Sequence, residues 1–494
     1  MNVMMINQGI RWIMGLCIGI CLYSCSKDSP GETPEPEPPE PNPVGLVYPS
    51  KEMRAVWLTT AWGLDWPMGD YTVAGQRQKY LAYLDKFKEM NVNTIFFQVR
   101  AMGDAYYHSD YEPWATSITG TRGKDPGYDI LKFLIEEAHA RDIEFHAWMN
   151  PYRIATRANN GTTYPALHSS INASWVVSHE KIQIYNPARE EVRKRIADIV
   201  KELISKYDVD GVHLDDYFYP DPSSAGVMVS DQTDYETYGA GFNTIQAWRR
   251  ANVDKAIEGI HNVIVATKPK VVFSISPAAN KDYNYNTLYA DVAKWCQQGW
   301  LDLLIPQLYQ EIGNSYNDFQ TNLGIWTQFA YDVPVVIGHG LYKFGDPTQP
   351  TAFQSTAELE KQINMAKKNR KVVGSAMYSA RYVMDNKIDI ADKLSSLYEK
   401  TGVMPFLGRS NSAVPTPAAN VRIEGNQLKW STSGNIKSVV YYFPVAASGA
   451  DRKGEVLAIT EEHTITVDKK GGYSVTTLGV DHQESKPSDL VEKN

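Results

Sequence analysis

The apolar residues of the chain gather in eight short runs that are rich in β-branched and aromatic side chains. A stretch with apolar residues at helical spacing follows each run. The runs, predicted as strands, cover residues 54–60, 94–100, 144–149, 211–215, 271–276, 303–309, 334–338 and 372–378. The stretches, predicted as helices, cover 76–90, 129–141, 188–207, 242–266, 288–297, 315–329, 356–368 and 388–400.

Eight strands, each followed by a helix, predict the α/β class and a (β/α)8 barrel, the TIM-barrel architecture. The barrel is expected over residues 46–405, about 350 residues against a usual ~250, so several loops must be long. Residues that act on a ligand are expected at the carboxyl ends of the strands, where such barrels carry their sites.

The composition changes after the barrel. Residues 406–418 are rich in Ser and Pro and predict a linker, and residues 419–494 predict a small all-β sandwich. Its strands are expected at 421–423, 427–430, 438–443, 455–459, 463–467 and 472–477. This part resembles fibronectin type III modules, with Trp430, Tyr441 and Tyr442 as its expected core. A spacer or stabilising role is favoured over glycan binding, because fold alone does not imply function.

The N-terminus predicts a lipid anchor. Arg11 precedes an apolar run over 12–22 that is too short to span a membrane and is typical of a signal peptide. The run ends in Leu-Tyr-Ser-Cys, which resembles a bacterial lipobox and implies a signal peptide over 1–24 with lipidation of Cys25. The alternative is an uncleaved helical anchor. Both alternatives place the protein on a membrane outside the cytoplasm. We expect a lipoprotein of the bacterial cell envelope, anchored at the outer membrane.

Residues 25–45 are acidic and rich in proline, so they predict an extended tether. At about 3.1 Å per residue, the proline-rich part would hold the folded chain some ~40 Å from the membrane.

Charge and composition mainly exclude functions. The net charge is -8, with Lys and Arg interspersed among Asp and Glu, which argues against a nucleic-acid partner. The glycine-rich motifs of nucleotide sites and the Gly-x-Ser-x-Gly elbow are missing, so no cofactor is expected. Only Cys296 lies outside the N-terminal region, which excludes a disulfide framework. His146, His213 and His339 have no local ligand spacing, so no metal is expected, and His146 is interpreted as a histidine of the barrel interior. A monomer is expected.

The fourth strand carries the strongest chemical signal, because it ends on the adjacent carboxylates Asp215 and Asp216. Alternation places Val212 and Leu214 on one face, with His213 and Asp215 on the face toward the lumen. Carboxylates at this end of a parallel strand are typical of a barrel hydrolase. The alternative is that they cap the next loop or form a structural ion pair.

The other strand ends deliver polar and aromatic groups, a mixture that suits a hydroxyl-rich ligand. The predicted substrate-binding residues are Trp57, Arg100, Trp148, Asn150, Tyr152, Arg153, His213, Gln307, Tyr309 and Tyr378. Strand seven brings no carboxylate, so the catalytic pair is expected to be Asp215 with Asp216, or one of them with Glu311 from the loop after strand six.

Five motifs together resemble the glycosyl-hydrolase-like family ten. They are MRAVWLTT at 53–60, QVR at 98–100, HAWMNPYR at 146–153, DGVHLDDY at 210–217 and PQLY at 306–309. The resemblance implies a (β/α)8 barrel in bacterial lipoproteins or secreted proteins, and glycosidase activity, because one branch cleaves peptidoglycan glycan strands stripped of their peptides.

The fourth-strand motif also resembles that of family-18 chitinases, whose acid is a Glu at the position of Tyr217. The substrate-assisted scheme of that family therefore does not carry over intact. Asp216 is expected to act as the acid in its place, while Asp215 holds the reacting sugar or stabilises its positive charge. Glu311 is the rival for either role.

The sequence thus predicts a membrane-anchored extracytoplasmic glycoside hydrolase that cleaves polysaccharide, with amino-sugar glycan strands of the peptidoglycan type as the expected substrate. Two alternatives stay open. One is a glycan-binding lipoprotein without turnover. The other is a surface glycosidase for host or dietary polysaccharide.

Overall fold

The computed structural model describes residues 45–157, 163–408, 413–434, 436–447 and 450–494. The predicted signal peptide, the lipidated Cys25 and all but the last residue of the predicted tether lie outside these residues. Within the described ranges, every helix is too short or too polar to cross a bilayer.

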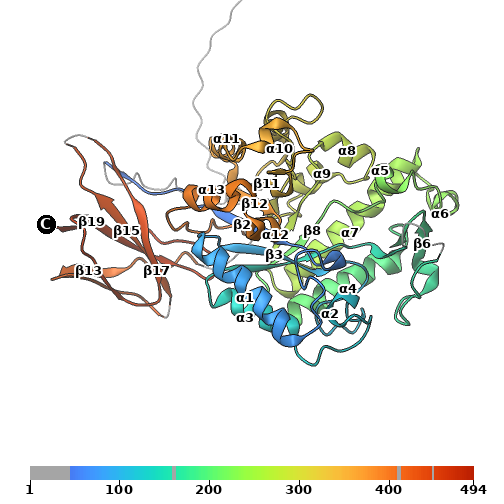
Figure 1. Ribbon diagram of the computed structural model, residues 1–494, viewed down its shortest axis with the longest axis horizontal. Coiled ribbons are helices and arrows are strands. Elements are labelled where there is room, and N and C mark those ends of the chain that lie inside the picture. Colours follow the sequence, from blue (N-terminus) through green and yellow to red (C-terminus); the bar gives the residue numbers. More distant parts are fainter. Residues whose placement is uncertain (1–44, 158–162, 409–412, 435, 448–449) are drawn as a thin grey trace, which may run out of the picture. The chain divides into compact units, whose positions relative to one another are not determined.

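Eight parallel strands close into a barrel in the order β10-β11-β12-β2-β3-β4-β8-β9. This confirms the predicted (β/α)8 barrel, and Figure 1 shows its helices arranged outside the strands. The strands are β2 (Met53–Leu58), β3 (Thr94–Arg100), β4 (Glu144–Met149), β8 (Gly211–Leu214), β9 (Val272–Ile275), β10 (Leu303–Leu304), β11 (Val335–Gly340) and β12 (Val372–Tyr378).

Strand β10 is much shorter than the predicted strand over 303–309. Pro306 has no N–H to donate to a ladder, so regular pairing stops before it. The chain stays at the barrel wall, because the Gln307 N–H donates to the Pro277 carbonyl over 3.0 Å. Gln307 is therefore presented at the mouth from irregular backbone.

Several of the longer helices begin at capped residues, and the longer helices bury one face against the strands. Asp129 accepts from the backbone N–H of Lys132 at the start of α3, and Thr244 accepts from that of Ala247 at the start of α7. The helices that follow the strands are α1 (Val73–Glu89), α3 (Ile130–His139), α4 (Glu190–Lys206), α7 (Ile245–Thr267), α9 (Val292–Gln297), α10 (Phe319–Phe329), α11 (Ala357–Ala366) and α13 (Ile390–Leu397). Shorter helices are α2 (Thr116–Thr119), α5 (Pro222–Ala225), α6 (Gln232–Tyr238), α8 (Lys281–Asn286) and α12 (Ala380–Asp385).

The barrel interior is filled by large side chains that alternate with those facing the helices. Trp57 of β2, Phe96 of β3 and Trp148 of β4 form one inner cluster. His146 is also buried there, and its Nε2 lies 3.0 Å from a Glu144 oxygen, as expected for an interior histidine. Gly211 of β8 lies against this imidazole, since a Cβ at that position would lie 2.2 Å from His146 Nδ1.

A three-stranded antiparallel insertion lies between β4 and α4 and supplies part of the extra length. Its strands are β5 (Arg153–Thr156), β6 (Val176–His179) and β7 (Ile182–Tyr185), in the order β5-β7-β6. The sequence pattern did not predict these short strands. They matter for the site because β5 begins directly after the end of barrel strand β4.

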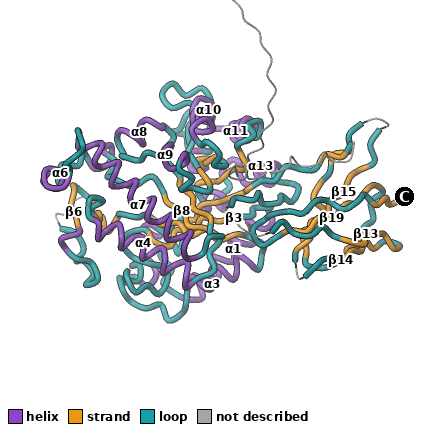
Figure 2. The backbone as a smooth tube through the Cα atoms, turned by 180° about the vertical axis from the view of Figure 1, so that it is seen from behind, coloured by secondary structure: helices purple, strands orange, loops and turns teal. Residues whose placement is uncertain are grey.

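The C-terminal part forms antiparallel sheets, which confirms the predicted small all-β region (Figure 2). One sheet has the order β17-β15-β19-β20 and the other β13-β14-β18. The strands are β13 (Ala419–Glu424), β14 (Gln427–Ser431), β15 (Lys437–Pro444), β17 (Glu455–Thr460), β18 (Thr464–Thr466), β19 (Gly471–Leu478) and β20 (Val491–Lys493), and β1 (Leu46–Val47) pairs with β16 (Arg452–Lys453).

Tyr442 and Trp430 share one cluster in this region, but Tyr441 packs in another cluster with Phe443. Neighbouring residues of a strand point to opposite faces, so the two tyrosines cannot share one core. The likeness to fibronectin type III and the boundaries at 406–418 stay predictions.

Candidate active site

The floor of the barrel mouth is built around His213 of β8. Its Nε2 accepts from Trp57 Nε1 over 3.1 Å, and its Nδ1 lies 2.8 Å from Ser274 Oγ. Burial, and to a lesser extent the charge of His146, holds the pKa of His213 well below the ordinary value, so the ring is neutral. His213 is fully buried, and its contacts fix the orientation of Trp57. The predicted contact of His213 with a sugar stays a prediction.

Asp215 follows β8 and is only 3% exposed. It accepts hydrogen bonds from Trp148 Nε1 (3.2 Å), from Asn150 Nδ2 (3.0 Å) and from the backbone N–H of Tyr217 (3.4 Å). Burial raises the pKa of Asp215, while the charge of Arg153 and these three donors oppose the increase. Donors on three sides hold the carboxylate in one orientation and favour its ionised form.

Asp216 lies past the end of the strand and is partly exposed, with a different environment. One oxygen accepts from Gln307 Nε2 over 3.2 Å, and the same amide donates to the Ser276 carbonyl over 2.9 Å. Burial, followed by the negative charge of Asp215, raises the pKa of Asp216 to about 7. Because Asp215 has more donors and a nearby guanidinium, it ionises first, and Asp216 stays largely protonated until the pH approaches about 7.

Asn150 connects several predicted residues. Its Oδ1 accepts from the backbone N–H groups of Tyr152 (3.2 Å) and Arg153 (2.7 Å), which orients its Nδ2 toward Asp215. Arg100 donates to the Asn150 carbonyl and forms an ion pair of 3.1 Å with Glu112. Arg100 and Tyr152 are fully buried, so the structure places both behind Asn150 rather than on the open face of the mouth.

Tyrosines form one wall of the mouth. The rings of Tyr309 and Tyr378 are stacked, with centroids 5.8 Å apart and planes at 22°, and Tyr342 meets both rings edge-on at 6.0 and 6.2 Å. Trp57 lies next to Tyr378, with ring centroids 6.2 Å apart. Aromatic faces of this kind suit the apolar face of a sugar ring.

Glu311 lies further along the loop after β10 and has its own partners. One oxygen accepts from Asn314 Nδ2 over 2.9 Å, while the other is buried without a hydrogen-bond partner. In the described part of the chain, no hydrogen bond joins Glu311 to Asp215 or Asp216. The structure therefore brings Asp215 and Asp216 into one network with Trp148, Asn150 and Gln307, and leaves Glu311 outside it.

One buried carboxylate at the mouth was not among the predicted site residues. Asp65 is nearly fully buried in the loop after β2, and it accepts from the Thr59 N–H (2.7 Å) and from Ser379 Oγ (3.0 Å). Burial raises the pKa of Asp65 to about 6. It connects the ends of β2 and β12. Its position after a strand end is the signal that could have identified it.

A pocket of about 280 Å³ opens beside this network, between the inserted sheet and the loop after β8. Asn150 and Arg153 line it together with Tyr217, Trp62 and Lys181, and the last three were not among the predicted site residues. Among the described residues, no group of three or more His, Cys, Asp and Glu is arranged to hold a metal.

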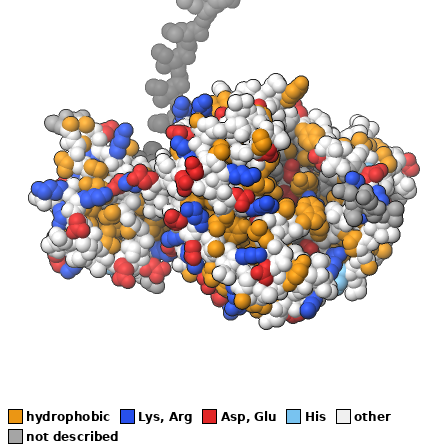
Figure 3. All heavy atoms as spheres, viewed as in Figure 1, with side chains coloured by type: hydrophobic (Ala, Val, Ile, Leu, Met, Phe, Trp, Pro, Cys, Tyr) orange, Lys and Arg blue, Asp and Glu red, His pale blue; other side chains and the backbone are white. Residues whose placement is uncertain are grey.

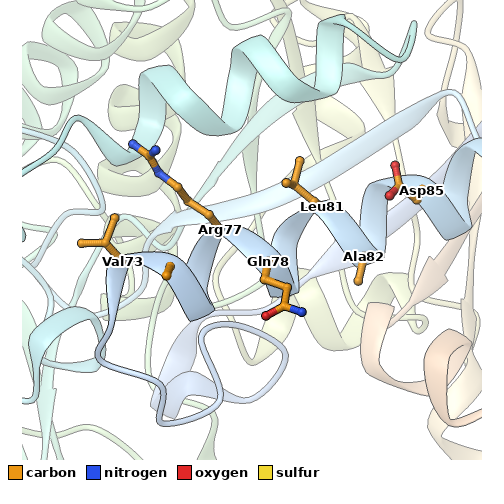
Figure 4. Close-up of a pocket in the computed structure, with 7 residues that line it drawn as sticks. Val73, Arg77, Gln78, Leu81, Ala82 and Asp85 are labelled. Carbon is orange, nitrogen blue, oxygen red and sulfur yellow. The ribbon is translucent and has the colours of Figure 1, made fainter.

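A second depression, of about 710 Å³, follows the outer face of helix α1 (Figure 4). Val73, Arg77, Leu81 and Asp85 line it, and none of the strand-end residues does. It is therefore separate from the candidate active site. Over the face shown in Figure 3, basic and acidic side chains are interspersed, without a large patch of one sign.

Comparison with known proteins identifies similar sequences and folds. The model of the family described as Glycosyl hydrolase-like 10 matches residues 52–354. The chain is 33% identical over 481 residues to "Glycosyl hydrolase YngK" of Bacillus subtilis, covering 90% of this chain and 94% of that protein. It is 30% identical over 424 residues to "Glycosyl hydrolase DigH" of Escherichia coli K12, covering 78% and 96%. Among solved structures, the glycoside hydrolase domain of PgaB (BpsB) from Bordetella bronchiseptica aligns with a TM-score of 0.48 and 11% identity, covering 70% of this chain and 98% of that one.

Proposed function

The chain belongs to the glycosyl hydrolase-like 10 family, and from this premise we propose that it hydrolyses glycosidic bonds in polysaccharide, with Asp216 as the general acid and Asp215 as the ionised partner. The observation that carries the proposal is the contrast between these adjacent carboxylates. Asp215 is held by three donors, whereas Asp216 is held by one and has a pKa of about 7. Two carboxyl groups whose environments separate their pKa values are the usual arrangement for glycoside hydrolysis.

The proposed reaction conserves protons. The Asp216 carboxyl donates its proton to the glycosidic oxygen as the bond from that oxygen to the anomeric carbon breaks. Asp215 stabilises the positive charge that develops on the sugar ring, and the Asn150 and Trp148 donors keep its carboxylate in place. Water then adds to the anomeric carbon, and its proton returns to Asp216.

The proposed substrate is an amino-sugar glycan of the peptidoglycan type. Support comes from the motifs that resemble the family, one branch of which cleaves peptide-free strands, and from the likeness of residues 210–215 to the chitinase motif. The stacked Tyr309 and Tyr378 rings offer a surface for a sugar ring. We further propose that lipidation of Cys25 anchors the protein at the outer membrane of a bacterial envelope, and that the C-terminal region serves as a spacer.

Hydrolysis of defined glycans tests the proposal. The protein without residues 1–24 is incubated with peptide-free glycan strands, with intact peptidoglycan and with a neutral plant polysaccharide, and products are identified by mass spectrometry. We expect shorter oligosaccharides from the peptide-free strands, and none from the Asp216→Asn variant.

Asp85→Asn is a matched control, because Asp85 is an exposed carboxylate on α1 with an Arg141 partner at 2.8 Å. It should cleave like wild type. Binding without products from any glycan would favour a glycan-binding protein, which Tyr217 at the position of the chitinase acid also suggests. Cleavage of the plant polysaccharide alone would favour the surface glycosidase.

A further inference from the structure

The pocket beside Asp215 and Asp216 is cationic. Of the side chains that line it, Arg153 and Lys181 are positive and Asp221 is the one carboxylate. Asp221 already accepts from Tyr283 Oη over 2.5 Å and from the Ser223 N–H over 2.8 Å.

Arg153 is the unusual member of this lining. Only 8% of the residue is exposed, yet among the described residues its guanidinium forms neither a hydrogen bond nor an ion pair. It contacts two rings instead, with its central carbon 4.7 Å from the centroid of Tyr217 and 5.8 Å from that of Trp62. The charge of Asp215 acts on this guanidinium from a distance, without a direct ion pair. A buried charge without a direct partner is costly, so a guanidinium held in this way is suited to a ligand that brings an anion into contact with it.

The two rings that hold Arg153 are themselves exposed. Trp62 is 65% exposed and has a backbone φ of 54°, in the left-handed region that bulky residues rarely adopt. Tyr217 is 44% exposed. Their own burial does not account for these positions, whereas cation–π contact with Arg153 stabilises them.

We propose that Arg153 binds a carboxylate carried by the glycan, so that this pocket selects acidic sugar residues. Guanidinium groups bind carboxylates with two parallel hydrogen bonds, which gives both strength and orientation. This inference rests on the proposed glycosidase function, because it places the acidic sugar within the field of Arg153 that also acts on Asp215. Two sources share this chemistry: the lactyl ether carboxylate of a muramic acid and the carboxylate of a uronic acid.

The proposal has a structural consequence for peptidoglycan. A peptide stem is joined to the lactyl carboxyl by an amide, which removes its negative charge. Strands that carry peptides would therefore lose the group that Arg153 binds, which fits the action of one family branch on peptide-free strands.

The test compares substrates that differ only in this charge. A peptide-free strand oligosaccharide is used as such and after reduction of its carboxylates to alcohols, and an oligosaccharide of N-acetylglucosamine and glucuronic acid is compared with its reduced form. For at least one pair, the wild type should show a kcat/KM about 10–100-fold higher on the acidic form, the range for loss of a charged bidentate contact. The pair that shows the preference identifies the source of the carboxylate.

Variants separate charge recognition from a general loss of activity. Arg153→Gln should bring the ratio between acidic and reduced substrates to about one, and Arg153→Lys should keep part of the preference. A structural role, or an effect on Asp215 alone, would lower both rates and leave the ratio unchanged. Arg77→Gln is the matched control, because Arg77 also lies over two rings, those of Tyr128 (4.9 Å) and Phe133 (4.8 Å), but outside the mouth. It should keep the wild-type ratio.

Equal cleavage of acidic and reduced forms by the wild type would overturn the inference and leave the glycosidase function standing. If no glycan is cleaved, calorimetric binding of the same oligosaccharides decides. Tighter binding of an acidic form that Arg153→Gln abolishes would support the carboxylate pocket while the proposed hydrolysis fails. Equal binding of the acidic and reduced oligosaccharides would overturn both the carboxylate pocket and the proposed hydrolysis.

Discussion

The two ends of the barrel differ in whether their buried charged side chains are paired with one another. At the amino end of the strands, Arg54 donates to Glu52 over 3.0 Å, and Glu144 lies within 3.0 Å of His146 and 2.5 Å of His482. At the carboxyl end, Arg100 is paired with Glu112 over 3.1 Å, but Asp216 has a raised pKa and, among the described residues, Arg153 forms no direct ion pair. The charges at the first end neutralise one another and stabilise the fold, whereas Asp216 and Arg153 at the mouth remain available to a ligand.

This contrast predicts the largest effect at the mouth. Asp215→Asn and Asp216→Asn should each lower turnover of a glycan at least about a hundredfold, the low end for loss of general acid–base catalysis. Both variants should fold, because Asn keeps the size of the side chain. Glu311→Gln should keep most activity, since Glu311 lies outside the network. Near-normal rates for both Asp variants with an inactive Glu311→Gln would move the site to the loop after β10.

The pH dependence sharpens the same comparison. Asp216 must be protonated to act, and its pKa of about 7 means that activity should fall as the pH rises through about 7. Removal of the neighbouring negative charge by Asp215→Asn should lower the pKa of Asp216 and move this decline to lower pH. Initial rates measured from pH 5 to 9 test the position of the decline in the wild type and its shift in Asp215→Asn. An unmoved decline in Asp215→Asn would show that the two carboxyl groups are not coupled.

A raised carboxyl pKa also destabilises the folded state. Asp216 has a higher pKa folded than the ~3.9 of an unfolded chain, so stability should decrease as the pH rises between about 4 and 7. Asp216→Asn removes this penalty and should raise Tm relative to wild type at pH 8, with little change at pH 4. Thermal unfolding followed by circular dichroism measures the difference, and an equal shift at both pH values would contradict the raised pKa.

At the opposite end, the charges should contribute stability and not activity. The pKa of Glu144 is lowered although burial opposes this, because His482 and His146 are close, and the charge of Glu144 raises the pKa of His482. The carboxylate contribution is complete above ~4.3 and is lost only as the pH falls through the lowered pKa of Glu144. The histidine contribution is complete below ~6.5 and is lost as the pH rises through the raised pKa of His482. His482→Gln should therefore cost about 1–2 kcal/mol near pH 6 and less at pH 9. Urea unfolding at these two pH values checks this, and an equal loss at both would refute the ion pair.

The smallest effect is expected from removal of the C-terminal region. Deletion of residues 413–494 should leave turnover of a short soluble glycan within about twofold, because none of the candidate site residues lies there. Stability should fall, since the contact between Glu144 and His482 is lost. Loss of turnover in a truncated protein that is still folded would show that this region completes the site.

The barrel was predictable because apolar runs and helical stretches alternate along the chain through all eight strand–helix units. Asp215 and Asp216 were predictable because they end a buried strand. The short strands β5, β6 and β7 were not predictable, because each has only four residues, too few for an alternation of apolar and polar residues to stand out. The pocket around Arg153 depends on contacts with Trp62 and Tyr217 from other loops, and no local pattern encodes such contacts.

Leaving-group dependence tests the assignment of Asp216 as the acid most directly. The rates of wild type, Asp216→Asn and Asp215→Asn are measured on an oligosaccharide and on an aryl glycoside of the same sugar, whose leaving group departs without protonation. The account predicts that Asp216→Asn regains most of its activity on the aryl glycoside while Asp215→Asn stays at least about a hundredfold slow, because only the first has lost a proton donor. Equal defects of Asp216→Asn on both substrates would contradict its role as the general acid.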